Sequence, residues 1–177
     1  MGSEEHRRLA RDAPVTCALV TVSDTRTAAT DDGGRLMRER LEAAGHRVDS
    51  ATIVPDEPER IRALLAELVE GPAEVLLLSG GTGISRRDRT FEAVSGLLEK
   101  TLPGFGELFR ALSFAEVGPA AMLSRATAGV YRGRLLVSMP GSPAAVRLAM
   151  DQLLVPELSH LAWELVRQGG VRPGGTG

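Results

Sequence analysis

Short apolar segments alternate with amphipathic segments along the first hundred residues of the chain. Residues 17–22 and 75–78 are continuous apolar runs of strand length, and residues 46–54 form a third predicted strand. In residues 36–44 and 61–69, apolar side chains recur every three or four positions, which predicts amphipathic helices. Strands and helices that alternate in this way form parallel βαβ units. We therefore predict an α/β fold, a three-layer α/β/α sandwich with a mostly parallel sheet.

The second half of the chain has a less regular pattern. Apolar positions in residues 91–98 indicate another helix, whereas residues 103–125 predict helical pieces and loops. Residues 128–138 predict a small β-hairpin that turns at an Arg-Gly pair. Residues 142–143 supply a serine N-cap followed by proline at the first helical position, so the final helix begins here. We expect Pro156 to kink or break that helix.

Composition indicates one domain of ordinary size. The chain has 177 residues, of which 43% are hydrophobic and 25% charged, so it can bury a proper core. We expect a flexible lead at residues 1–14, a single domain at residues 15–168 and a disordered tail at residues 169–177.

Several classes of partner are disfavoured. The net charge of −2 and the six aromatic residues offer neither a basic surface nor a stacking platform for nucleic acid. No apolar run approaches the length of a membrane span, and the N-terminus lacks the apolar core of a signal peptide. Cys17 is the only cysteine, so no internal disulfide can form. We therefore expect a cytoplasmic protein with no membrane partner and no nucleic-acid partner.

Residues 79–83, Ser-Gly-Gly-Thr-Gly, are the most informative segment. They follow a buried strand and precede a helix, and glycines there let a ligand approach the backbone N–H groups. An anion such as a phosphate suits this site, although the lysine of the nucleotide-binding P-loop is missing. A tight turn without a ligand explains the glycines equally well. If the phosphate hypothesis holds, Gly81→Val abolishes ligand binding at a modest cost in stability.

Polar residues follow each of the predicted parallel strands. In such sheets, ligands bind beyond the carboxyl ends of the strands, so these residues converge. Taken singly, each has a local explanation: Asp24 as a turn acid, Asp56 as a helix-dipole partner, and Asp88 and Ser142 as helix caps. The predicted substrate-binding residues are Ser23, Asp24, Ser79, Gly80, Gly81, Thr82, Gly83, Pro140, Gly141 and Ser142.

Asp56 and Asp88 are the candidate metal ligands. If the fold brings both toward a phosphate, they could hold Mg²⁺, which prefers carboxylate and phosphate oxygens. Such a metal suits phosphoryl or nucleotidyl transfer. Cys17 lies in a predicted buried strand and no Ser-His-Asp arrangement is visible, so we do not expect a protein nucleophile. We interpret all three histidines as structural or exposed.

Seven motifs occur in an order that resembles one known family. They are Val20-Thr21-Val22-Ser23-Asp24, Val54-Pro55-Asp56-Glu57, Ser79-Gly80-Gly81-Thr82-Gly83, Arg87-Asp88-Arg89-Thr90-Phe91-Glu92-Ala93, Pro103-Gly104-Phe105-Gly106-Glu107, Leu123-Ser124-Arg125-Ala126-Thr127-Ala128-Gly129 and Met139-Pro140-Gly141-Ser142-Pro143. The chain resembles the MogA/MoaB family of molybdenum-cofactor biosynthesis proteins, related to the gephyrin G domain and its plant counterpart. The resemblance spans roughly residues 15–165 and is closer to the MoaB branch at residues 105–116.

The resemblance implies a molybdopterin-binding domain and a nucleotidyltransferase activity. The family's reaction converts molybdopterin and Mg-ATP to adenylyl-molybdopterin and pyrophosphate, with Asp56 and Asp88 as the catalytic and metal-facing acids. It also implies a homotrimer or a dimer of trimers. The alternative is a non-catalytic carrier or regulator that binds molybdopterin. At residues 31–34 the family usually has D-x-[ST]-G, and this chain has Gly33 in place of the hydroxyl residue.

Overall fold

The computed structural model describes residues 13–167. The lead predicted for residues 1–14 lies outside the described residues except for its last two, and the tail predicted for 169–177 lies wholly outside them. A six-stranded sheet forms the centre, in the order β2-β1-β3-β6-β5-β4. Strands β1, β2, β3 and β6 are parallel, and β5 is antiparallel to both β6 and β4. The strands are β1 (Thr16–Val22), β2 (Arg47–Val54), β3 (Val75–Ser79), β4 (Lys100–Thr101), β5 (Thr127–Tyr131) and β6 (Arg134–Met139).

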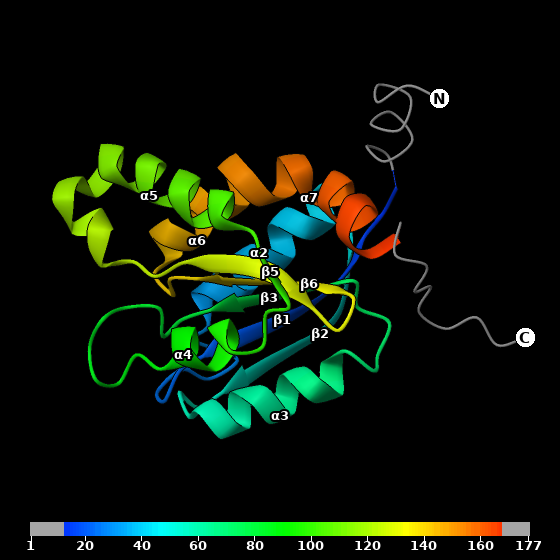
Figure 1. The fold of residues 1–177 in the computed structure, drawn as a ribbon, viewed down its shortest axis with the longest axis horizontal. Coiled ribbons are helices and arrows are strands. Elements are labelled where there is room, and N and C mark those ends of the chain that lie inside the picture. Colours follow the sequence, from blue (N-terminus) through cyan, green and yellow to red (C-terminus); the bar gives the residue numbers. More distant parts are fainter. Residues whose placement is uncertain (1–12, 168–177) are drawn as a thin grey trace, which may run out of the picture.

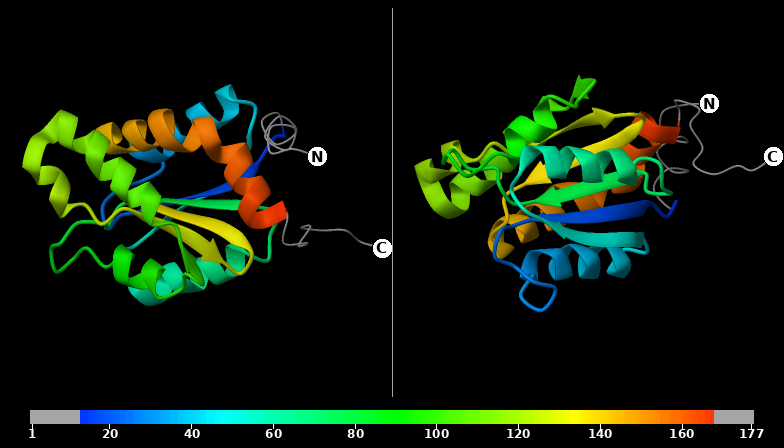
Figure 2. Two further views of the ribbon diagram at one scale, coloured as in Figure 1. Left: turned by 45° about the horizontal axis from the view of Figure 1, so that its top comes forward. Right: turned by 90° about the horizontal axis from the view of Figure 1, so that it is seen from below.

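Helices cover both faces of this sheet (Figure 1). The predicted three-layer α/β/α fold, with its mostly parallel sheet and its hairpin of β5 and β6, is therefore confirmed. One face carries α2 (Asp32–Ala43), α5 (Pro103–Val117), α6 (Pro143–Ala149) and α7 (Val155–Ala162), and the other carries α3 (Pro58–Leu68) and α4 (Thr90–Ser95). Figure 2 shows the same layers from two further directions.

The alternation of side chains along the strands builds two separate cores. In β1, Cys17 and Leu19 point into the layer of α2 and α6, whereas Ala18 and Val20 point toward α3. All four side chains are buried. Burial, together with the charge of Glu74, raises the pKa of the Cys17 thiol to about 12. Cys17 is therefore a small core residue, buried in a strand as the sequence predicted.

Three segments differ from the sequence prediction. Residues 103–125 are mainly one fifteen-residue helix, α5, followed by the 3₁₀-helix η1 (Gly118–Leu123), rather than scattered pieces. The two-residue strand β4 at the sheet edge was not predicted. The break expected at Pro156 takes the form of a π-helical turn, η2 (Met150–Leu154), directly before α7. Because proline has no N–H, a regular α-helical ladder cannot run through it unbroken.

The first and last described residues lie at the edge of the sheet where the parallel strands begin. After α7, the π-helical segment η3 (Trp163–Arg167) returns to that edge. There the Arg167 guanidinium pairs with the Glu74 carboxylate at 2.7 Å and donates to the Pro14 carbonyl at 2.8 Å. Within residues 13–167, no helix has the length and apolar character needed to cross a bilayer.

Candidate functional site

The four parallel strands end together at one edge of the sheet. Val22 at the end of β1 is in register with Val54 of β2, and Thr21 is in register with Ser79 at the end of β3. Ser79 is in turn in register with Met139, the last residue of β6. Ser79 is the last residue of β3, and the loops that follow the strands carry the other predicted substrate-binding residues, so the structure brings all of them to one edge, as the parallel topology requires.

Two positions in the turn after β3 require glycine. Gly80 has φ +112° and Gly81 has φ +61°, both in the region that side chains avoid. A Cβ on Gly80 would lie 2.2 Å from the Val22 carbonyl oxygen, and one on Gly81 would lie 2.0 Å from Oγ1 of the buried Thr90. Gly81→Val therefore costs more stability than the modest amount expected from the sequence.

The loop after β6 packs directly on this turn. A Cβ on Gly141 would lie 3.1 Å from Cα of Gly80, so the two backbones touch. Ser142 confirms its predicted capping role, since its Oγ accepts the Ala145 N–H at 3.2 Å. Ser23 Oγ likewise accepts the N–H groups of two residues of its own loop. Both hydroxyls still have a proton to donate to a ligand.

The turn at residues 79–83 is called here the glycine turn. Asp56 lies between this turn and helix α4. Its carboxylate accepts the Arg89 N–H at 3.3 and 3.4 Å, and a Cβ on Gly81 would lie 2.7 Å from its Oδ2. Its own N–H donates to Asp24 Oδ1 at 3.0 Å. Burial raises the pKa of the Asp56 carboxyl, the charges of Asp88 and Asp24 raise it further, and the hydrogen bonds from Arg89 and Thr90 oppose the rise.

Asp88 occupies the other side of the turn. Its Oδ2 accepts the Ser85 N–H at 3.0 Å and also the Ser85 hydroxyl, and a Cβ on Gly83 would lie 2.6 Å from Oδ2. One local explanation from the sequence was that Asp88 caps α4, and the structure shows that this explanation is wrong. The N-cap position of α4 is Arg89, whose side chain accepts no capping bond, and its N–H is bound by Asp56 from another loop.

The carboxylate oxygens suit a hard cation such as Mg²⁺. Asp56 and Asp88 come from different loops and are close enough for the charge of one to raise the pKa of the other. Within residues 13–167, however, no three Asp, Glu, His or Cys side chains converge as a complete metal site. The residues thus fit a metal that completes its coordination with phosphate oxygens and water, which is the usual arrangement for Mg²⁺.

Arg125 is a site residue to which the sequence analysis gave no role. It follows η1, and its guanidinium donates to the Gly83 carbonyl at 2.9 and 2.6 Å and to the Asp88 carbonyl at 2.9 Å. It also pairs with the Glu92 carboxylate and lies 4.8 Å from the centre of the Phe91 ring. Arg125 belongs to the motif at residues 123–129, but the residue pattern alone does not reveal that its partners are backbone carbonyls.

Arg125 also lies between two cavities. A cavity of about 440 Å³ lies beside the segment that follows the glycine turn in the chain and is lined by Ser85, Asp88 and Arg89. A second cavity, of about 380 Å³, lies beneath α5 and is lined by Gly106 and Arg110. Because Arg125 lines both cavities, it forms part of the wall between them.

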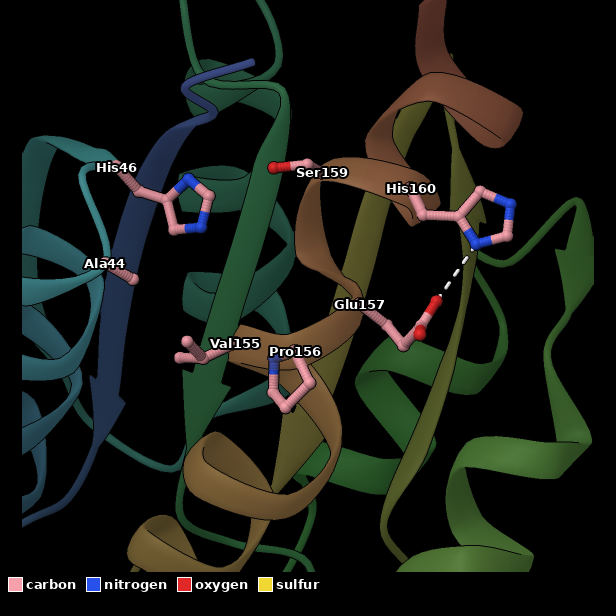
Figure 3. A pocket seen from close by; sticks show the side chains of 7 residues that line it. All are labelled: Ala44, His46, Val155, Pro156, Glu157, Ser159 and His160. Carbon is pink, nitrogen blue, oxygen red and sulfur yellow. Dashed lines mark hydrogen bonds and ion pairs between the residues drawn. The ribbon is translucent and has the colours of Figure 1, made fainter. Parts of the chain in front are cut away.

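A third cavity, of about 290 Å³, lies away from the candidate site (Figure 3). It is lined by residues of α7, among them His160, and by His46, which directly precedes β2. His46 is buried, and its Nδ1 accepts the Val15 N–H at 3.2 Å. His160 pairs with Glu157 at 2.9 Å. These two histidines are structural or paired at the surface, as predicted, and His6 lies outside the described residues.

Known proteins share the sequence pattern and the fold of this chain. The chain matches the family model described as "Probable molybdopterin binding domain" over residues 18–160. It is 51% identical over 170 residues to molybdenum cofactor biosynthesis protein B of Bacillus cereus, covering 95% of this chain and 100% of that protein.

Solved structures agree with this match. A crystal structure of molybdenum cofactor biosynthesis protein B is 52% identical, with a TM-score of 0.84 over 88% of this chain and 98% of that one. The tungsten cofactor synthesizing protein MoaB from Pyrococcus furiosus is 36% identical, with a TM-score of 0.78 over 86% of this chain and 97% of that one. On fold, sequence and the arrangement of the strand-end loops, the chain belongs to the MoaB branch of the MogA/MoaB family of molybdenum cofactor biosynthesis proteins.

Proposed function

We propose that this protein binds molybdopterin at the carboxyl edge of the sheet and transfers the adenylyl group of ATP to it. In this reaction, an oxygen of the molybdopterin phosphate forms a bond to the α-phosphorus of ATP. The bond between that phosphorus and the bridging oxygen breaks, and pyrophosphate leaves. The observation that carries the proposal is the position of two carboxylates, Asp56 and Asp88, against the glycine turn.

In the proposed complex, the backbone binds the molybdopterin phosphate. The positive φ values of Gly80 and Gly81 shape the turn, and the absence of side chains leaves its N–H groups accessible to an anion. Gly141 contacts the turn from the loop after β6, and Ser142 follows it at the start of α6. These contacts between neighbouring loops hold the turn in place, so binding should require little reordering of the backbone.

The role of the acids follows from charge. Asp24, Asp56 and Asp88 place negative charge beside a turn built for an anion, and this arrangement alone would repel phosphate. A cation bound by Asp56 and Asp88 reverses that effect. When bound, Mg²⁺ would offset the charge that develops on the phosphates during transfer. A protein that only carried molybdopterin would have no need for acids at this position, which favours the enzyme over the carrier.

The test is an assay with molybdopterin and Mg-ATP, in which AMP-linked pterin and pyrophosphate are measured. We expect Asp56→Asn and Asp88→Asn to lower the rate about a hundredfold or more, equivalent to about 2.7 kcal/mol of barrier, while molybdopterin binding persists. Asp49→Asn, on the exposed edge strand β2, is the matched control and should retain the wild-type rate. Rates within twofold of wild type in both site variants would instead support the non-catalytic carrier or regulator.

We also propose that the chain assembles as a homotrimer or a dimer of trimers in the cytoplasm. Large apolar side chains that are 52–74% exposed gather on α5 and η1. They are Leu108, Phe114, Val117, Met122 and Leu123, called here the α5–η1 patch. Exposed apolar surface of this kind is typical of protein interfaces. A second copy of the chain fits the assembly that the family resemblance implies.

A further inference from the structure

The Gly83–Asp88 segment of the site depends on one side chain from a distant part of the chain. Arg125 donates to carbonyl oxygens at both ends of this segment, Gly83 and Asp88. Its own N–H donates to the Thr82 carbonyl at 3.0 Å. Inside the segment, the Asp88 carboxylate and Ser85 bind each other. Arg125 therefore holds the two ends of the segment together, while the bonds between Asp88 and Ser85 hold its interior.

The other contacts of Arg125 fix the guanidinium in place. The Glu92 carboxylate on α4 pairs with it, and the Phe91 ring lies against it at 4.8 Å. About a quarter of the side chain is exposed, so it is held in a partly desolvated position. The planar guanidinium presents several N–H groups in a rigid fork, which a lysine ammonium cannot reproduce. The arrangement is suited to fixing the loop on α4.

We propose that Arg125 is a positioning residue for Asp88. By fastening Gly83 and Asp88 to α4, it holds the Asp88 carboxylate beside the glycine turn, where the proposed transfer takes place. The inference rests on the proposed function for its catalytic consequence. Its structural part, the closure of the Gly83–Asp88 segment, is independent of any reaction.

The structural part is tested by hydrogen exchange and by limited trypsin cleavage after Arg86 and Arg87, which lie within the segment. Arg125→Gln should raise amide exchange and cleavage in this segment at least tenfold, with Arg125→Lys intermediate. Slow exchange in β1 and β3 verifies that each variant is folded. Arg38→Gln is the matched control, because Arg38 pairs with Glu42 on α2 and not with the segment. An unchanged segment in folded Arg125→Gln would overturn the proposal.

The catalytic part is tested by a double-mutant cycle with Arg125→Gln and Asp88→Asn. If Arg125 acts through Asp88, Arg125→Gln should lower kcat at least tenfold with KM for molybdopterin within about threefold, and should have little further effect in Asp88→Asn. Effects that multiply independently would show that Arg125 acts by another route, such as direct contact with a nucleotide phosphate, and would overturn the proposal. If the wild type has no transferase activity, the proposed function fails, and the exchange experiment still decides whether Arg125 closes the segment.

Discussion

Asp56 and Asp88 face the same turn but are held there by different means. Asp56 accepts the N–H of Arg89, the N-cap residue of α4, from a separate loop, whereas Asp88 binds within its own loop and is oriented through Arg125. A change at Thr90, whose hydroxyl donates to Asp56, should therefore disturb Asp56, and a change at Ser85 should disturb Asp88. The two acids can be altered separately, which makes their individual roles measurable.

Asp56→Asn should change the pH dependence of stability. Because the pKa of Asp56 is raised above its ordinary value of 3.8, the wild type is favoured while the carboxyl is protonated and loses that advantage as pH rises through the raised pKa. The neutral variant avoids this loss. Its Tm relative to wild type should therefore increase between pH 3.5 and pH 7, as followed by thermal unfolding. Asp49→Asn should show no such trend, and a relative Tm that fell with pH would contradict the assignment.

At the scale of elements, the positions of the buried strands were more predictable than the helix boundaries. Buried runs such as residues 75–78 stand out in the sequence because both faces of a parallel strand are covered. The continuity of α5 was obscured because it carries apolar residues on two sides: Phe105 and Phe109 enter the core, whereas Phe114 is exposed. Strand β4 was missed because its two exposed residues show no alternation of apolar and polar positions.

The candidate site was predictable only in part, because its motifs are local in the sequence whereas several of its contacts join distant loops. Each strand-end motif is local, and parallel topology then brings the motifs to one edge. Contacts between distant loops have no local pattern. Neither the bond from Arg89 to Asp56 nor the contacts of Arg125 with Gly83 could be inferred from spacing, because they depend on how α4 and η1 pack.

Helix α2 begins where this chain departs from the family pattern, and Gly33→Ser should restore the missing hydroxyl without strain. A Cβ on Gly33 would make ordinary contacts, 3.5 Å from Val146 Cγ2 and 3.8 Å from Ser79 Oγ. Replacing a helical glycine should add up to about 1 kcal/mol of stability. We expect molybdopterin affinity to stay equal or increase, as measured by titration calorimetry.

Gly34→Ser is the matched control for that substitution. A Cβ on Gly34 would lie 2.8 Å from Cγ of Asp31, the residue whose carboxylate caps α2 through the Gly34 N–H. The second variant should therefore lose stability. Equal melting temperatures for the two variants would show that the first turn of α2 is not packed as described.

For the whole molecule, the α5–η1 patch is the surface on which assembly can be tested. Phe114→Glu combined with Met122→Glu places two charges in a surface that the proposed oligomer buries, so the variant should become monomeric. Light scattering should return three or six times the chain mass of 18.8 kDa for the wild type and a single chain mass for the variant. Ala63→Glu, at an exposed position of α3, is the control and should not change the mass. A wild-type monomer across dilution would refute the assembly.

The contact of Arg167 with Pro14 has a practical consequence for engineering. It brings the first and last described segments together at the edge where the strands begin, opposite the glycine turn. A fluorescent protein, affinity handle or surface tether joined directly at residue 13 or residue 167 would extend from the edge opposite the glycine turn. Protein immobilised at either of these two positions should therefore keep its strand-end loops open to solution, and labels there should not obstruct those loops.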